Sequence, residues 1–408
     1  MTRWRSCVHQ KTLMRTIFVA AWLMLDLSMM ENITSFGKTD TLFLHLLRCG
    51  VTGEEPRADL FPISEEEWSV VWQTAQQQAV SAVVFSAVRR LSQELRPDHQ
   101  KIFLPWLSET SDTTMTNERL FQTCQNICQR FRKAGFHACI LKGQGVAQLY
   151  PDPLLRQSGD IDVWLWPDKV ALGTASSLQA RRSYIMEYVW HYKKNVRPVY
   201  HHVDFNVLKQ VNMEVHFTPT WMNAPCRNKW IQRWFERQSV EQFEEVEAGF
   251  CKPTGAFNAV YLMLHIYRHF FSEGIGLRQL TDYFCLLNTW QPSAQENEDI
   301  TAALKHLGIR KFASALMYVL GEVFGLEKEK MLTPPAKKEG LHLLHEVMLA
   351  GNFGHSDERF AHHADGSFSA FITRTRRNFR FVKYYPSEVL WSPVWKVGHY
   401  FWRKNHRY

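Results

Sequence analysis

The chain has 408 residues, of which 45% are hydrophobic and 22% are charged, and this composition excludes a disordered chain, a collagen and a coiled-coil rod. At about 150 residues per domain, the length predicts two or three domains. The 48 Lys and Arg residues exceed the 40 Asp and Glu residues, so the net charge is +8. Residues 374–408 alone hold nine basic residues and one acidic residue, so the basic character is expected at the carboxyl end and not over the whole surface.

The amino-terminal segment contains an apolar run of nine residues, 17–25, which ends at Asp26. A membrane span needs about 20 apolar residues, so no transmembrane span is predicted. The basic start is similar to a signal peptide, but no cleavage site of the small-x-small type follows, and a membrane-associated helix is a second alternative. The interpretation that we favour is that translation starts at Met29 or Met30 and that residues 1–30 are an upstream extension.

The next segment, residues 31–135, has apolar residues at helical spacing throughout. Ser64 and Glu67 stand at capping-box spacing at the start of one such pattern. Cys124 and Cys128 lie four residues apart on the apolar stripe of another, so we expect them to pack within a helix and not to bind a metal. We therefore predict an N-terminal helical region over residues 31–135.

The pattern changes after residue 135. Residues 136–143 form a short apolar run bounded by glycine, which predicts a buried strand, and residues 159–167 predict a second strand after a short helical stretch. We expect a helix from Asp168 and then three β-rich segments, which are residues 184–193, 199–209 and 211–219.

This succession predicts an α/β core over residues 136–225, and the helical pattern that resumes after Trp221 predicts a C-terminal helical domain over residues 226–408. The predicted fold class is α+β, with a small mixed-sheet core flanked by N-terminal and C-terminal helical regions. The eight cysteines are scattered and form no Cys-x-x-Cys pair, which is typical of a reducing compartment, so we predict a cytoplasmic protein.

Two carboxylates, Asp160 and Asp162, stand two apart in a predicted strand, so both project from the same face. Such close like charges disfavour each other's ionisation unless a cation lies between them, and oxygen ligands favour Mg²⁺ or Mn²⁺. Glu214 would complete a three-carboxylate site if its strand were adjacent, and such a site suits phosphoryl transfer. Asp-x-Asp alone is also common in solvated loops, so the interpretation depends on its surroundings.

The stretch Leu141-Lys142-Gly143 ends one predicted strand and opens a short helix, where free N–H groups favour phosphate and Lys142 adds a positive charge. This is not a Walker A loop, because no Lys-Ser/Thr pair follows at the required spacing. It is not a dinucleotide-binding fingerprint either, because Gln148 stands where the third glycine is needed.

These residues carry a resemblance to a known family. The stretch LKGQGVAQLYPDPLLRQSGDIDVWLW (141–166), with MEVHF (213–217), resembles the uncharacterised nucleotidyltransferase family of the polymerase-β-like superfamily. The run LHIYRHFFSEGIGLRQLTDYF (264–284) is similar to the helical domain of that family. The resemblance extends from about residue 40 to the end and leaves the first thirty residues unmatched.

The resemblance implies a nucleotidyltransferase-like core and transfer, dependent on Mg²⁺ or Mn²⁺, of a nucleoside monophosphate from an NTP to an unidentified acceptor. It implies that Asp160, Asp162 and Glu214 are the catalytic residues and metal ligands. The residues that it places at the nucleotide are Lys142, Gly143, Arg156, Ser158, Gly159 and His216. Two departures from the superfamily pattern are that Gln144 follows Gly143 and that the gap to Asp160 is long. A fold that has lost its activity is therefore the alternative.

Several further side chains have two interpretations each. His216 shares a strand face with Glu214 and either orients a carboxylate or is structural. Arg156 either reaches a phosphate or pairs with Asp152, and Arg278 and Asp282 are expected to form an i,i+4 ion pair that holds the helical domain on the core. His201 and His202 alternate along a predicted strand, so at most one should face the site. His265 and His269 have chelating spacing but lack the glutamate of a metalloprotease motif.

The basic tail, residues 374–408, also contains ten Phe, Trp and Tyr residues. Bases interleaved with aromatic residues can bind nucleic acid by phosphate contact and stacking, or a membrane surface. However, Trp391, Trp395 and Trp402 recur at helical spacing, which favours packing against the protein. The alternative function is thus a catalytically inactive module that binds nucleic acid or a protein partner through this tail.

Overall fold

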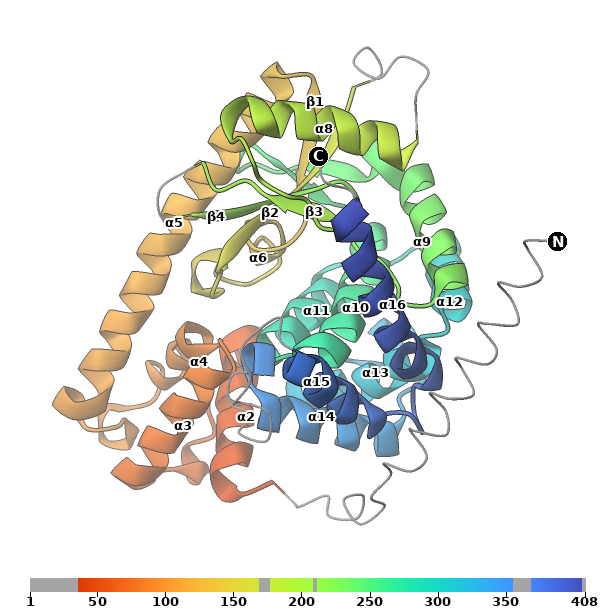
Figure 1. Cartoon of the computed structure of the whole chain (residues 1–408). Helices are drawn as coiled ribbons and strands as arrows, with labels where there is room; N and C mark the ends of the chain where they lie inside the picture. Colours follow the sequence, from red (N-terminus) through yellow and green to blue (C-terminus); the bar gives the residue numbers. More distant parts are fainter. Residues whose placement is uncertain (1–35, 169–176, 208–210, 355–367, 406–408) are drawn as a thin grey trace.

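The computed structural model describes residues 36–168, 177–207, 211–354 and 368–405 (Figure 1). The predicted extension and start site therefore lie outside the described residues, as does most of the helix predicted from Asp168. Within these ranges no helix combines the length and the apolar character needed to cross a membrane.

The N-terminal region is helical, as predicted. Its elements are α2 (Lys38–Thr52), α3 (Glu65–Gln77), α4 (Ser81–Val88) and α5 (Leu104–Lys133). The predicted capping box is confirmed, because Ser64 Oγ accepts from the Glu67 N–H and the Glu67 carboxylate accepts from the Ser64 N–H. The long helix α5 runs from the α3 and α4 region up to the sheet (Figure 1). Cys124 and Cys128 are buried thiols on it, as expected.

The centre of the fold is a six-stranded mixed sheet with the order β3-β4-β2-β1-β6-β5. Its strands are β1 (Phe136–Ile140), β2 (Asp160–Pro167), β3 (His202–Asp204), β4 (Asn212–His216), β5 (Phe243–Glu245) and β6 (Cys251–Pro253). The pairs β2–β4 and β1–β6 are parallel, and the other three pairs are antiparallel. The predicted α+β class with a mixed sheet is confirmed.

Two sequence-based expectations about this part are wrong. Residues 184–192, predicted as β-rich, belong to helix α8 (Leu178–Tyr192), in which Ile185, Met186 and Val189 are buried at helical spacing. The pattern expected to be helical from Trp221 to the end is interrupted by β5 and β6, which extend the sheet beyond residue 225. Each of these strands has only three residues, too few to show an alternating pattern.

The two faces of the sheet differ sharply. Ile161, Val163 and Val215 are fully buried on one face, in the core cluster that also holds the apolar residues of α5 and α8. Because side chains alternate along a strand, the intervening residues, Asp162 among them, point to the opposite face. The strands β2 and β4 therefore direct Asp162, Glu214 and His216 to one side of the sheet, and the helices of the C-terminal region cover that side (Figure 1).

The C-terminal region consists of α9 (Pro225–Gln238), α10 (Gly255–Ser272), α11 (Leu277–Thr289), α12 (Ala294–Leu307), α13 (Arg310–Phe324), α14 (Lys337–Ala350), α15 (Phe368–Phe379) and α16 (Pro386–Asn405). The buried residues of α10 to α14 form one hydrophobic cluster with those of α2, α3 and α4. The N-terminal and C-terminal helices thus share a core, although the sheet lies between them in the sequence.

Helix α16 carries the tryptophans of the basic tail back toward the sheet (Figure 1). The ring of Tyr200 lies 5.1 Å from that of Trp395 and 6.4 Å from that of Trp402, and the Arg182 guanidinium lies 5.1 Å from the Trp402 ring. The expectation that these aromatic residues pack against the protein is confirmed for Trp395 and Trp402.

The single acidic residue of the tail, Glu388, is fully buried at the start of α16. Asn223 donates a hydrogen bond to one of its oxygens, and the other has no hydrogen-bond partner among the described residues. Burial raises the pKa of Glu388 to about 7, although the positive charges of Arg268 and Arg227 oppose this shift. Tyr267 also faces the group.

We expect Glu388 to make the protein less stable as the pH rises. Between about pH 4.5 and pH 7 the unfolded chain ionises at this residue while the folded chain does not, so the free energy of unfolding falls by about 3 kcal/mol. Glu388→Gln should remove this slope in urea unfolding measured from pH 4.5 to 8. The exposed Glu329→Gln should retain it. Equal slopes for the two variants would contradict the assignment.

Candidate active site

The parallel pairing of β2 with β4 brings residues far apart in the sequence into contact. Its register sets Asp162 opposite Glu214 and Asp160 opposite Asn212, so the predicted carboxylates lie on one face of two neighbouring strands. His216 Nε2 lies between two of them, 2.8 Å from Asp162 Oδ1 and 3.3 Å from Glu214 Oε2. The ligand atoms of Asp162, Glu214 and His216 lie within 4.8 Å of one another.

Asp162 is the buried centre of this cluster, with no exposed surface. Lys142, which follows β1, places its Nζ 2.9 Å from Asp162 Oδ2. Burial would raise the pKa of Asp162, but Lys142 and His216 outweigh burial and hold it well below its usual range. In the same way, hydrogen bonding to Asp162 and Glu214 outweighs burial and raises the pKa of His216 to about 9. The cluster therefore holds alternating positive and negative groups.

Asp160 lies one pleat away on the same strand face and is partly exposed. The negative charge of Asp162, followed by burial, raises its pKa, although Lys142 acts in the opposite direction. The positive groups at Asp162 therefore do not fully compensate the charge of Asp160. The predicted repulsion between the two aspartates is present in the structure.

The turn after β1 matches the expectation that Lys142 and Gly143 end a strand and open a short helix, α6 (Gln144–Ala147). Gly143 has φ +55°, which side-chain-bearing residues rarely adopt. A Cβ atom at this position would lie 3.2 Å from the Asp160 carbonyl oxygen. Glycine thus lets the turn approach the start of β2 closely.

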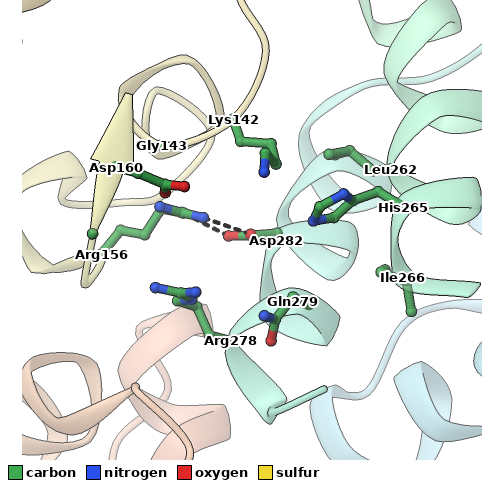
Figure 2. A pocket seen from close by; sticks show the side chains of 11 residues that line it. Lys142, Gly143, Arg156, Asp160, Leu262, His265, Ile266, Arg278, Gln279 and Asp282 are labelled. Carbon is green, nitrogen blue, oxygen red and sulfur yellow. Dashed lines mark hydrogen bonds and ion pairs between the residues drawn. The ribbon is translucent and has the colours of Figure 1, made fainter. Parts of the chain in front are cut away.

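A pocket opens between this turn and the helices α10 and α11, and Figure 2 shows its side chains converging from both sides. The sheet side contributes Lys142, Gly143, Arg156, Gly159 and Asp160, and the helical side contributes Leu262, His265, Ile266, Arg278, Gln279 and Asp282. Of the predicted site residues, Asp160 and Lys142 therefore face both the carboxylate cluster and the pocket. Glu214 and His216 lie on the far side of Asp162.

Arg156 and Asp282 form a buried, bidentate ion pair across the pocket (Figure 2). Arg156 Nε lies 2.7 Å from Asp282 Oδ1, and Nη2 lies 2.8 Å from Oδ2. The Tyr150 hydroxyl donates to Asp282 Oδ1 at 2.8 Å, and Arg156 Nη1 donates to Ser158 Oγ at 3.1 Å. Arg156 thus binds Asp282 and not Asp152, its expected alternative partner.

Sequence reasoning missed the pairing of Asp282 with Arg156. The i,i+4 spacing predicted Arg278 as the partner, because the residues of a helix give no signal for an arginine that lies elsewhere in the sequence. Arg278 Nη1 donates to the Gln157 carbonyl at 2.9 Å, so this arginine also connects α11 to the loop before β2. The predicted attachment of the helical domain to the core is present. Its ion pair joins Asp282 on α11 to Arg156 in the loop before β2.

The expectation that at most one of His201 and His202 faces the site is wrong. His202 Nδ1 lies 3.2 Å from Glu214 Oε2 and 2.9 Å from His201 Nε2. The alternation of side chains does not apply to His201, because β3 begins only at His202 and residue 201 lies in a bend. The rings of His265 and His269 on α10 are 4.3 Å apart, but neither belongs to a group of three metal-ligating residues within the described ranges.

A family model described as "Uncharacterised nucleotidyltransferase" matches residues 64–325. The chain belongs to this nucleotidyltransferase family. A search of curated proteins gives no match. Among solved structures, an antigenic nucleotidyltransferase-like protein from Paracoccidioides brasiliensis is similar at 12% identity and a TM-score of 0.31, over 54% of this chain and 96% of that chain.

The side chains of the carboxylate cluster fit a divalent cation. Asp160, Asp162 and Glu214 supply carboxylate oxygens from one sheet face, which are the ligands that Mg²⁺ and Mn²⁺ prefer. Three carboxylates exceed the two positive groups, Lys142 and His216, that contact them. A cation would therefore lower the electrostatic free energy of the cluster.

The Arg156–Asp282 pair gives a test of how the two parts of the protein are held together. Asp282→Ala should lower the free energy of unfolding by about 3–5 kcal/mol, because it leaves the Arg156 guanidinium buried without its partner. The double variant Arg156→Met with Asp282→Leu should lose less, since it leaves no buried charge unpaired. Urea unfolding compares the three proteins. A double variant less stable than Asp282→Ala would refute this account of the pair.

Proposed function

We propose that this protein is a metal-dependent nucleotidyltransferase that moves a nucleoside monophosphate from an NTP to an acceptor. The observation that carries the proposal is the β2–β4 register, which sets Glu214 beside Asp162 on the face that also carries Asp160. Membership of the nucleotidyltransferase family supports the same reaction class. Three carboxylates on one sheet face suit the binding of metal ions during phosphoryl transfer.

In this proposal Asp160, Asp162 and Glu214 hold Mg²⁺ or Mn²⁺, which neutralises charge on the triphosphate and on the pyrophosphate leaving group. Lys142 and His216 keep Asp162 ionised, because both stabilise its negative charge. A buried carboxylate without such partners would take up a proton and lose its ability to bind a cation. These two residues are therefore positioning residues for the carboxylate cluster.

The pocket beside the cluster is suited to an anionic substrate. Lys142, Arg156 and Arg278 contribute three positive charges, and Asp160 and Asp282 contribute two negative ones. Asp282 holds the Arg156 guanidinium in a fixed orientation at the pocket wall. We infer that the triphosphate lies along Lys142 and Gly143, with Arg156, Ser158 and Gly159 at its side, because fixed positive groups bind phosphates at little entropic cost.

The alternative, an inactive module that binds nucleic acid or a protein partner through residues 374–408, has less support. Trp395 and Trp402 pack against Tyr200, so their rings are engaged within the protein. Binding through the tail would weaken steeply with salt and would not respond to a change at Asp160. The two hypotheses can therefore be separated by the same set of variants.

Asp160→Asn should lower nucleotidyl transfer at least about 100-fold, the scale on which single electrostatic contacts to a phosphoryl transition state matter. It should not destabilise the fold, because the charge of Asp160 is opposed by that of Asp162. The assay incubates purified protein and cell lysate with each α-labelled NTP and Mg²⁺, so that the size of the labelled product characterises the acceptor. Chelation with EDTA should abolish labelling.

The matched control is Asp112→Asn, an exposed aspartate on α5, which should leave transfer unchanged. Thermal unfolding of both variants should match the unmodified protein. Full labelling by Asp160→Asn would refute the catalytic assignment. Salt-sensitive nucleic-acid binding that Asp160→Asn leaves intact, in a protein that labels no acceptor, would support the alternative.

A further inference from the structure

A histidine-rich cluster lies at the edge of the sheet, next to the carboxylates. It consists of His201 and His202 at the start of β3 and of Glu214 and His216 on β4, where the antiparallel register sets His202 opposite His216. Ligand atoms of His201, His202 and His216 all lie within 4.8 Å of one another. Neither the family assignment nor the proposed transfer reaction accounts for the two residues on the β3 side.

Close contacts join the donor atoms of the cluster in a chain. His201 Nε2 lies 2.9 Å from His202 Nδ1, which lies 3.2 Å from Glu214 Oε2, which in turn lies 3.3 Å from His216 Nε2. His216 Nε2 also lies 2.8 Å from Asp162 Oδ1, so carboxylates already engage this nitrogen. The buried Nδ1 of His216 has no hydrogen-bond partner among the described residues, so it is the nitrogen that remains for a metal ion.

The side chains around these donors also resemble those of established metal sites. A histidine that binds a metal through one nitrogen usually directs the other toward a carboxylate. His202 Nε2 faces the exposed Asp204, with Oδ1 at 3.6 Å. The backbone at His201 is fixed, because its carbonyl accepts from the Phe217 N–H at 2.8 Å. His202 and Glu214 keep 15% and 29% of their side-chain surfaces exposed, which gives an ion a path to the site.

We propose that His201, His202 and His216 bind one divalent transition-metal ion, of which Zn²⁺ is the representative, separately from the oxygen-ligated metal of the transfer reaction. Three imidazole nitrogens favour such an ion over Mg²⁺, which requires oxygen ligands and retains water. His216 binds the ion through Nδ1, so its Nε2 keeps the hydrogen bond to Asp162. The ion joins the edge strand β3 to β4, and Glu214, which contacts His202 and His216, lies beside it.

The test is metal binding by the full chain. Protein stripped with EDTA is titrated with ZnCl₂ in the presence of millimolar MgCl₂, and Co²⁺ is used in parallel as a probe whose visible absorption reports tetrahedral nitrogen ligation. We expect one Zn²⁺ per chain that Mg²⁺ does not displace, and a rise in the temperature of thermal unfolding. His202→Ala should weaken Zn²⁺ binding by more than about tenfold, since even outer-shell changes have effects of that size.

Two controls separate this proposal from others. Asp160→Asn should retain Zn²⁺ binding while it loses nucleotidyl transfer, because Asp160 is not among the three histidine ligands. The double variant His265→Ala with His269→Ala removes the chelating pair on α10 and should also retain Zn²⁺ binding. If His202→Ala fails to fold, His202→Gln keeps the shape and polarity of the side chain without the imidazole. The proposal is overturned if the unmodified protein binds no Zn²⁺, if a folded His202 variant binds it as tightly, or if only the α10 variant loses it.

Discussion

The structure depends on the stabilisation of one buried charge. Asp162 has no exposed surface, and an ionised carboxylate can be buried only where cations and hydrogen-bond donors replace water. Lys142 approaches from the end of β1 and His216 from β4, while Asp162 itself lies on β2. The three central strands must therefore keep one register, because a slip of one residue would turn either the acid or its partner to the apolar face. The register of the sheet therefore also determines where the candidate catalytic carboxylates lie.

The helical region closes the side of the pocket that lies opposite the sheet. Asp160 lines the sheet side of the pocket, and α10 and α11 close the opposite side with His265, Arg278 and Asp282. Burial, reinforced by the charge of Lys142, keeps the pKa of His265 far below its usual value, so His265 itself adds no positive charge to this wall. The pocket is positive mainly through arginine and lysine, whose charges do not depend on physiological pH.

The parts of the site that could be predicted from the sequence follow from local periodicity. Asp160 and Asp162 had to share a face because side chains alternate in a strand, and Gly143 marked a turn that only glycine adopts easily. No local sequence signal gives the order of the strands in a sheet. The contact between Glu214 and Asp162 could therefore be predicted only on the condition that β4 lies beside β2, which is the order in the structure. The partner of Arg156 could not be predicted for the same reason, since Asp282 approaches from a distant helix.

Two errors of the sequence-based prediction, at α8 and at His201, also have physical causes. Helix α8 is rich in aromatic and β-branched residues, which favour strands, but the spacing of Ile185, Met186 and Val189 places them on one buried helical face. Tertiary packing overrides such local preferences. Strand alternation assigned His201 and His202 to opposite faces, and this prediction failed because β3 starts only at His202. A shift of one residue at a boundary is enough to reverse the predicted direction of a side chain.

Seen across the sheet, the polar side chains form one continuous row in which the ligand chemistry changes gradually. The row runs across β1, β2, β4 and β3 and contains Lys142, Asp162, His216, Glu214, His202 and His201. The carboxylate of Asp162 lies toward the pocket, whereas the imidazoles of His202 and His201 lie toward the sheet edge. Because Glu214 lies between these two ends, occupation of either end by a cation changes the charge that the other end experiences. The carboxylate of Glu214, which completes the proposed transferase site, thus also connects that site electrostatically to the edge of the sheet.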